Sequence, residues 1–225
     1  MRPGCPALER LADAIDHHLS GVSGEAAAIA EVRGALARFR AAAPDRTLAA
    51  GSSSPICGHL DAALALAARQ SGETLLADIR AALPFLAWIT YNAYPADEIG
   101  PLFPAQHAFA SLAAPYDATY ELDFDLGLLL IAPHTLYRDH RHQAAELYLP
   151  LTGPSRWRFG IGAAWETRAA GEPVWNPPQK LHATLVEDVP LLCLYAWTRD
   201  VHLPAELVPA TDWLAIEADL VAQAS

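Results

Sequence analysis

The spacing of apolar residues predicts helices in the first third of the chain. Apolar side chains recur every three or four residues there, which places them on one face of an α-helix. Gly21 and Pro84 follow the first and the last of these stripes and are typical helix ends. We predict four packed helices, with apolar stripes over residues 8–19, 29–39, 60–67 and 75–83.

The period changes to that of a β-strand after Ala118. Apolar residues from Tyr120 to Leu126 alternate with acidic ones, as expected for a half-buried strand. Glycines and prolines separate the strand-like pieces that follow, and many short strands of this kind predict a jelly-roll sandwich or barrel. We expect Thr211-Asp212 to cap a final helix. The strand-like pieces cover residues 127–132, 146–151, 156–161, 173–175, 181–186 and 191–197.

These patterns divide the chain into four parts. We predict a helical region (1–84), a connector rich in aromatic residues and proline (85–117), a β-barrel (118–205) and a C-terminal helix (206–225). The connector is most simply packed on the barrel, and the alternative is that it closes one side of a pocket. Alanine-rich helix faces allow close packing on the barrel or across a homodimer interface.

Composition narrows the class of protein. Of the 225 residues, 52% are hydrophobic and 18% are charged, which is ample for a large core. Lys plus Arg minus Asp plus Glu is 15 − 26 = −11, and no basic run occurs, so we expect no nucleic-acid partner.

Cysteine number and hydropathy predict a cytoplasmic protein without a membrane partner. An odd number of widely spaced cysteines (Cys5, Cys57 and Cys193) fits a reducing compartment better than a disulfide scaffold. The N-terminal residues lack the apolar core of a signal peptide. The longest apolar run, 126–133, is too short to cross a bilayer.

Candidate chemistry is concentrated in residues 134–153, around His140-x-His142-x3-Glu146. Imidazole and carboxylate groups are ligands for first-row transition metals. On one straight strand these side chains would share a face, but His142 and Glu146 would be about 13 Å apart. If they bind one ion, the chain must turn at 143–145 and return as a paired strand. A second turn near 152–154 would end that strand.

A second motif, Gly171-x5-Pro177-x4-His182, begins 31 residues after His140. The two motifs together resemble the paired motifs of the cupin superfamily. The resemblance implies a mainly β fold, a double-stranded β-helix or jelly-roll barrel, here with a helical N-terminal region and a C-terminal helix. It implies one divalent transition metal (Fe, Mn, Zn, Ni or Co) held by His142, Glu146 and His182, with His140 as a fourth ligand. The alternative is that these are polar residues on an exposed sheet face.

The sequence departs from the cupin motifs outside the ligand positions. His134 replaces the usual leading glycine of the first motif. In the second motif, Gln179 replaces a glycine and Val186 an asparagine. These changes bear on the turns more than on metal binding.

Two tyrosines make the resemblance more specific, from the cupin superfamily to one family within it. Tyr137 and Tyr148 flank the first motif, which continues into Leu-Pro-Leu-Thr-Gly and a tryptophan-bearing strand. This pattern resembles the cupin-type dimethylsulfoniopropionate lyases. The resemblance implies that a tyrosine removes the proton next to the substrate carboxylate, so that dimethyl sulfide leaves and acrylate forms. Tyr148 and Tyr137 are both candidates for the base.

The residue types suit that reaction. A cation can neutralise a carboxylate and so acidify the neighbouring C–H bond, and a tyrosine can act as base if its pKa is lowered. The expected partner is a small zwitterionic sulfonium compound, whose cation aromatic rings can attract. Six aromatic residues of the predicted barrel are available for this: Tyr120, Trp157, Trp165, Trp175, Tyr195 and Trp197.

Two other functions remain open at this level. One is a different metal-dependent cupin enzyme, a lyase, isomerase or Fe(II) dioxygenase acting on another small carboxylate, because one ligand set serves several reactions. The tyrosines favour the lyase, since a dioxygenase needs no phenolic base. The other is a non-catalytic ligand-binding cupin. The helical third has few basic residues and offers no DNA-binding element to support that reading.

Overall fold

The structure, a computed structural model, describes residues 5–42, 51–112 and 123–224. The expected strand positions from Tyr120 to Leu122 therefore lie outside the described residues. In the first third, all four predicted apolar stripes form α-helices whose apolar faces are buried. These helices are α1 (Pro6–Ser20), α2 (Ala26–Ala42), α3 (Leu60–Ser71) and α4 (Glu73–Ala82), with a short 3-10 helix, η1 (Pro55–His59), before α3.

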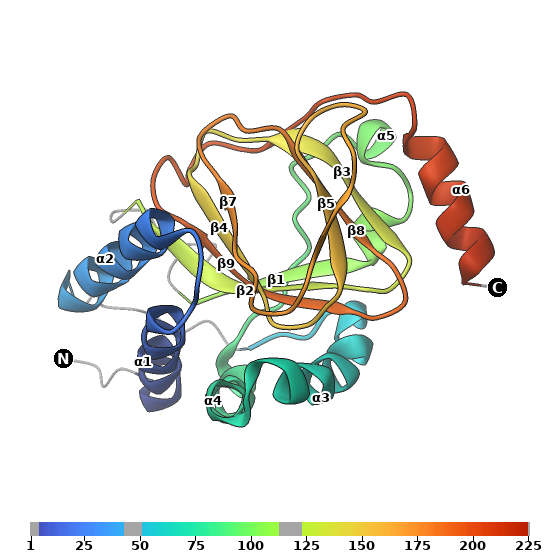
Figure 1. Cartoon of the computed structure of the whole chain (residues 1–225). Helices are drawn as coiled ribbons and strands as arrows, with labels where there is room; N and C mark the ends of the chain where they lie inside the picture. Colours follow the sequence, from blue (N-terminus) through green and yellow to red (C-terminus); the bar gives the residue numbers. More distant parts are fainter. Residues whose placement is uncertain (1–4, 43–50, 113–122, 225) are drawn as a thin grey trace.

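The chain that follows the N-terminal helices forms two five-stranded antiparallel sheets, which face one another (Figure 1). The two sheets confirm the predicted cupin jelly-roll barrel with a helical N-terminal region and a C-terminal helix. The first sheet has the order β1 (His107–Ser111), β2 (Asp125–Ile131), β9 (Leu191–Trp197), β4 (Glu146–Pro150), β7 (Val174–Asn176). The second sheet has the order β10 (Glu206–Leu207), β3 (Thr135–Arg141), β8 (His182–Val186), β5 (Ser155–Arg158), β6 (Glu166–Arg168).

The connector expected at 85–117 contributes one strand to the barrel. β1 pairs with β2 in register from His107–Ile131 to Ser111–Gly127. Its sequence, His-Ala-Phe-Ala-Ser, contains no β-branched residue, so local propensity gives little sign of a strand. Pairing with the apolar β2 decides its structure. The other short elements of this stretch are η2 (Leu83–Phe85), α5 (Ala96–Ile99) and η3 (Phe103–Ala105). The four-part division of the chain stays a prediction.

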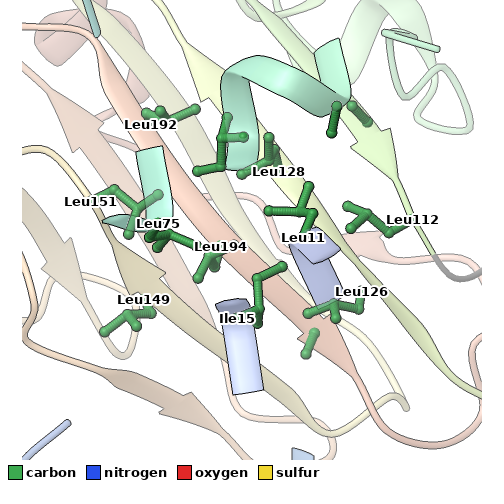
Figure 2. Close-up of a cluster of buried hydrophobic side chains, with 14 of the residues drawn as sticks. Leu11, Ile15, Leu75, Leu112, Leu126, Leu128, Leu149, Leu151, Leu192 and Leu194 are labelled. Carbon is green, nitrogen blue, oxygen red and sulfur yellow. The ribbon is translucent and has the colours of Figure 1, made fainter. Parts of the chain in front are cut away.

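The N-terminal helices cover the outer face of the first sheet. Figure 2 shows Leu11 and Ile15 of α1 against leucines of β2, β4 and β9. Burial of these apolar side chains is the main term that holds the helical region on the barrel, at about 25 cal/mol per Å². The inner face of the first sheet is left to face the second sheet.

Helix α6 (Trp213–Gln223) packs on the outer face of the second sheet beside β3 (Figure 1). Trp213 packs with Leu136 of β3, and Arg138 of β3 binds Glu217 with an Nε–Oε1 distance of 2.7 Å. Asp212 precedes the helix as predicted, but its carboxylate binds Arg158 and makes no capping hydrogen bond. No helix in the described part of the chain is long and apolar enough to cross a membrane.

The turn at 143–145 forms as predicted, but the expected pairing of its two strands is wrong. β3 and β4 flank the turn and belong to different sheets. The chain therefore crosses the barrel at the turn, which brings His142 and Glu146 together in the interior. The second predicted turn, at 152–154, returns the chain to the second sheet at β5.

Candidate metal centre and active site

A β-bulge in β3 sets the direction of the side chains on that strand. Tyr137 is opposite Thr184 and His140 is opposite His182, so three steps along β3 match two along β8. On a regular strand, residues three apart would point to opposite faces. The bulge brings Tyr137 and His140 to the same inner face.

Three buried histidines converge inside the barrel. His140 and His182 are cross-strand neighbours on β3 and β8, and His142 follows the end of β3. We call His140, His142 and His182 the histidine cluster. One ring nitrogen from each lies within 4.8 Å of the other two, which is close enough for one metal ion to contact all three.

Backbone carbonyl groups fix the orientation of each imidazole. Because a carbonyl only accepts, each Nδ1 donates its proton to that carbonyl, and each Nε2 is left as the nitrogen that can bind a metal. The Nε2 atom of His140 is buried and has no hydrogen-bond partner among the described residues. For His140, His142 and His182 in turn, the acceptors are the carbonyls of Arg138 (2.8 Å), Ala144 (2.8 Å) and Lys180 (2.9 Å).

Glu146 completes this group from the opposite sheet. Its Oε2 lies 2.9 Å from Nε2 of His142 and 3.3 Å from Nε2 of His182. Its Oε1 accepts a hydrogen bond of 2.6 Å from Nε1 of Trp197, which holds the carboxylate in place. One oxygen is thus anchored and the other faces the histidine cluster.

Burial and charge determine the protonation of the group. Burial and the neighbouring imidazoles hold the pKa of His140 well below its usual value, and burial also lowers the pKa of His182. Burial opposes charge on His142, but the Glu146 carboxylate outweighs it and raises the pKa of His142. Burial likewise opposes charge on Glu146, and His142 outweighs it, so the pKa of Glu146 is well below its usual value.

This chemistry fits a divalent cation. The group holds an ionised carboxylate and three imidazoles with one ring nitrogen each within 4.8 Å of the others, and a buried negative charge needs a partner. The structure brings together His140, His142, Glu146 and His182, the four residues that the sequence pattern selects. The histidine cluster can hold a transition metal, whose identity these ligands do not select.

The two candidate tyrosines both border the histidine cluster. The ring of Tyr148 is 6.3 Å from that of His182, and burial, together with the charge of Glu146, raises its pKa well above 10. The Tyr137 hydroxyl is 2.8 Å from the hydroxyl of Tyr94, a connector residue. Burial also raises the pKa of Tyr94 well above 10.

A cavity beside the histidine cluster is lined mainly by aromatic side chains. Of the six aromatic residues that the sequence offered for binding a cation, Tyr195 and Trp197 line the cavity. Trp157 does not line it and packs against Tyr148. The remaining predicted aromatics do not line it, or lie outside the described residues in the case of Tyr120. The full lining is Tyr91, Phe109, Asp125, Tyr137, Glu146, Tyr148, Tyr195, Trp197, Val201 and Ala205.

Residues of the connector line one side of this cavity. This agrees with the second of the two expectations for the connector, that it closes one side of a pocket, and not with a segment that is only packed on the barrel. Tyr91 and Phe109 come from the connector, and the hydroxyl of Tyr91 accepts a hydrogen bond of 3.0 Å from the backbone N–H of Ala205. Sequence reasoning did not assign these residues to the site. The only available signal was the density of aromatic residues in that stretch.

The two substituted glycine positions keep a glycine-like backbone. His134 has φ 55° and Gln179 has φ 64°, both in the left-handed region. Gly171 of the second motif has φ 83°. The turns of the motifs are therefore retained despite the larger side chains.

Comparisons with known proteins agree with this architecture. A sequence model described as dimethylsulfoniopropionate (DMSP) lyase matches residues 28–193. Among solved structures, a chain from the DMSP lyases RdDddP and RnDddQII has a TM-score of 0.62 at 20% identity, covering 91% of this chain and 98% of that one. The DMSP lyase DddQ from Ruegeria pomeroyi DSS-3 has a TM-score of 0.59 with the same identity and coverage. No curated protein matches the sequence.

Proposed function

Since this chain belongs to the dimethylsulfoniopropionate lyase family, we propose that it cleaves DMSP to dimethyl sulfide and acrylate. The observation that carries the proposal is the histidine cluster with Glu146, next to Tyr137 and Tyr148 in a cavity with aromatic walls. The proposed reaction is a β-elimination, and the enzyme is a carbon–sulfur lyase.

We assign His140, His142, His182 and Glu146 as ligands of one divalent transition metal. One nitrogen of each histidine lies within 4.8 Å of the others, Oε2 of Glu146 lies next to Nε2 of His142 and of His182, and the opposite atom of each side chain is hydrogen-bonded to the protein. When bound, the ion supplies positive charge that neutralises the substrate carboxylate and makes the neighbouring C–H bond more acidic.

We assign proton abstraction to Tyr148. Its phenolate oxygen takes the proton from the carbon next to the carboxylate, and that electron pair forms the double bond of acrylate. The C–S bond breaks, and dimethyl sulfide leaves with the bonding electrons. Burial and the charge of Glu146 raise the pKa of Tyr148, and a positive charge held at Glu146 would offset the second of these two causes.

Tyr137 has the position of a residue that orients the substrate. Its ring is stacked on His140 and its hydroxyl is tied to that of Tyr94, so the side chain is held on two sides. A fixed hydroxyl at the cavity wall can hold a substrate carboxylate in a reactive orientation.

The aromatic wall suits the sulfonium group. A dimethylsulfonium cation has no hydrogen-bond donor, and aromatic faces attract such cations by about 0.5–2 kcal/mol. Tyr91, Tyr195 and Trp197 present this kind of surface to the cavity.

Release of dimethyl sulfide tests the proposal directly. Purified protein loaded in turn with Fe, Mn, Zn, Ni or Co is incubated with DMSP, and headspace gas chromatography measures dimethyl sulfide. We expect release with at least one metal, and a Tyr148→Phe variant with the same metal content serves as control. No release with any of the five metals would refute the substrate assignment.

Location and assembly remain predictions. Cys5, Cys57 and Cys193 are all free thiols, which supports the reducing, cytoplasmic compartment that we propose. A homodimer stays an expectation from the alanine-rich helix faces.

A further inference from the structure

We propose that Asp125 determines substrate specificity by binding the cationic group of a dipolar carboxylate substrate. This inference rests on the proposed function and extends it, because it assigns the residue that recognises the cation. It also fixes the orientation of the substrate, with its carboxylate at the histidine cluster and its cation at Asp125.

Strand register places Asp125 in one row with the metal-site residues. Asp125 of β2 is opposite Trp197 of β9, and Trp197 is opposite Glu146 of β4. Paired residues of antiparallel strands project to the same face, and all three line the cavity. With two strand spacings between them, the backbones of Asp125 and Glu146 are about 10 Å apart. That span accommodates an ion and a substrate with a two-carbon spacer.

Hydroxyl groups hold the Asp125 side chain. The Tyr195 hydroxyl donates to Oδ2 at 3.0 Å, and the Ser111 hydroxyl donates to Oδ1 at 2.5 Å. Both carboxylate oxygens are therefore held by hydroxyl donors. Asp125 is half-buried, so its charge acts in a partly desolvated cavity.

A glycine makes room for this arrangement. Gly127 is opposite Tyr195, and a Cβ atom on Gly127 would lie 2.9 Å from Cε1 of the Tyr195 ring. The same atom would lie 2.3 Å from the carbonyl oxygen of Ala110. The absence of a side chain at 127 therefore lets the Tyr195 ring lie where its hydroxyl reaches Asp125.

The resulting cavity has two unlike ends. A metal held by the histidine cluster would offset the charge of Glu146 and supply positive charge for a substrate carboxylate. Asp125 leaves the other end negative, between the rings of Tyr195 and Trp197, where an onium group without hydrogen-bond donors is attracted by charge and by aromatic faces. An uncharged group of equal size would cover the carboxylate without replacing its hydration.

The test compares two non-reacting ligands of the same shape. The ligand 3-(trimethylammonio)propionate carries the positive charge, and 4,4-dimethylpentanoate has the same shape with a neutral carbon in place of the cationic nitrogen. Calorimetry measures their Kd values on metal-loaded wild type, Asp125→Asn and a control, Asp188→Asn, that removes an equal charge from an exposed loop.

We expect Asp125→Asn to weaken binding of the cationic ligand by about tenfold or more. Binding of 4,4-dimethylpentanoate should stay unchanged or become tighter, and Asp188→Asn should change the binding of neither ligand. For DMSP turnover, KM should rise more than kcat falls. Tyr195→Phe, which keeps the ring and removes one donor to Asp125, should give a smaller loss confined to the cationic ligand.

Equal weakening of both ligands, or no change for the cationic one, would overturn the assignment of Asp125. The outcome is separable from that of the proposed function because binding needs no turnover. An Asp125-dependent preference for the cation without dimethyl sulfide release would support this inference and refute the lyase reaction. Full release of dimethyl sulfide without an Asp125-dependent preference for the cation would support the lyase reaction and refute this inference.

Discussion

The ring of Tyr137 lies flat against the imidazole of His140, with centroids 3.9 Å apart and an angle of 14° between the planes. The bulge in β3 makes this stacking possible, because it turns both side chains to the same face. The bulge in β3 thus sets the positions of both His140, a candidate metal ligand, and Tyr137, a candidate substrate-orienting residue.

The two tyrosines should differ in their kinetic effects. We expect Tyr148→Phe to lower kcat roughly 100-fold or more, because the proposed base is removed. Tyr137→Phe should mainly raise KM, since its hydroxyl is assigned to orientation. Metal analysis should show unchanged occupancy in both variants. If both variants keep full turnover, the tyrosine mechanism is wrong.

Removal of a proposed ligand should release the metal. We expect Glu146→Ala and His182→Ala to lose bound metal, measured by elemental analysis after dialysis, because each removes an inward-facing donor atom. His59→Ala is the matched control, since His59 is exposed and outside the site. Unchanged metal content in either ligand variant would contradict that assignment.

The buried ion pair between Arg158 and Asp139 should contribute far more to stability than an exposed pair. Their side chains are 1% and 0% exposed, and Asp139 also accepts from Nε1 of Trp213 at 2.7 Å. Removing Arg158 leaves a buried carboxylate without its cation, so Arg158→Ala should lower the free energy of unfolding by about 3–5 kcal/mol. Arg141→Ala, in a pair that is 47% and 64% exposed, should cost about 1 kcal/mol or less. Urea unfolding measures the free energy of unfolding of both variants. Equal decreases for Arg158→Ala and Arg141→Ala would argue against a larger contribution from the buried pair.

His107 should make stability depend on pH in the acid range. Its Nε2 accepts from the backbone N–H of Tyr91 at 3.1 Å, its Nδ1 is 2.6 Å from the carbonyl of Phe103, and burial lowers its pKa to about 4. Between about pH 6.5 and 4 the unfolded chain therefore binds a proton that the folded chain does not. The free energy of unfolding therefore decreases as the pH is lowered from about 6.5 to about 4, by about 3 kcal/mol in total.

A substitution isolates this contribution. We expect His107→Gln to show a shallower decrease in the free energy of unfolding from pH 6.5 to 4 than the wild type does. His59→Gln, at an exposed position, should keep the wild-type slope. Identical slopes for His107→Gln and wild type would show that His107 is not the group responsible.

The sequence predicted those parts of the fold that follow from local periodicity. The stripe from Leu8 to Leu19 became α1, and the turn at 143–145 followed from the need to bring His142 close to Glu146. Both arguments use distances along the chain, which the sequence contains directly. The candidate metal ligands were selected for a similar reason, because their type and spacing are specific, and the structure places His140, His142 and His182 together.

Features that depend on long-range pairing were not predicted. The sheet membership of β3 and β4, the strand β1 and the bulge before His140 are all determined by partners distant in sequence. Asp212 shows the same limit for a single side chain. Its position indicates a helix cap, but Arg158, which is 54 residues away, binds its carboxylate instead.

Arg138 connects the outside of the barrel with its interior. Its carbonyl accepts the Nδ1–H of His140, and its guanidinium binds Glu217 of α6 and the carbonyl of Glu98. A shift of the Arg138 backbone would move the carbonyl that orients the imidazole of His140. We therefore expect affinity for the ion and attachment of α6 to be linked, and such a linkage acts equally in both directions.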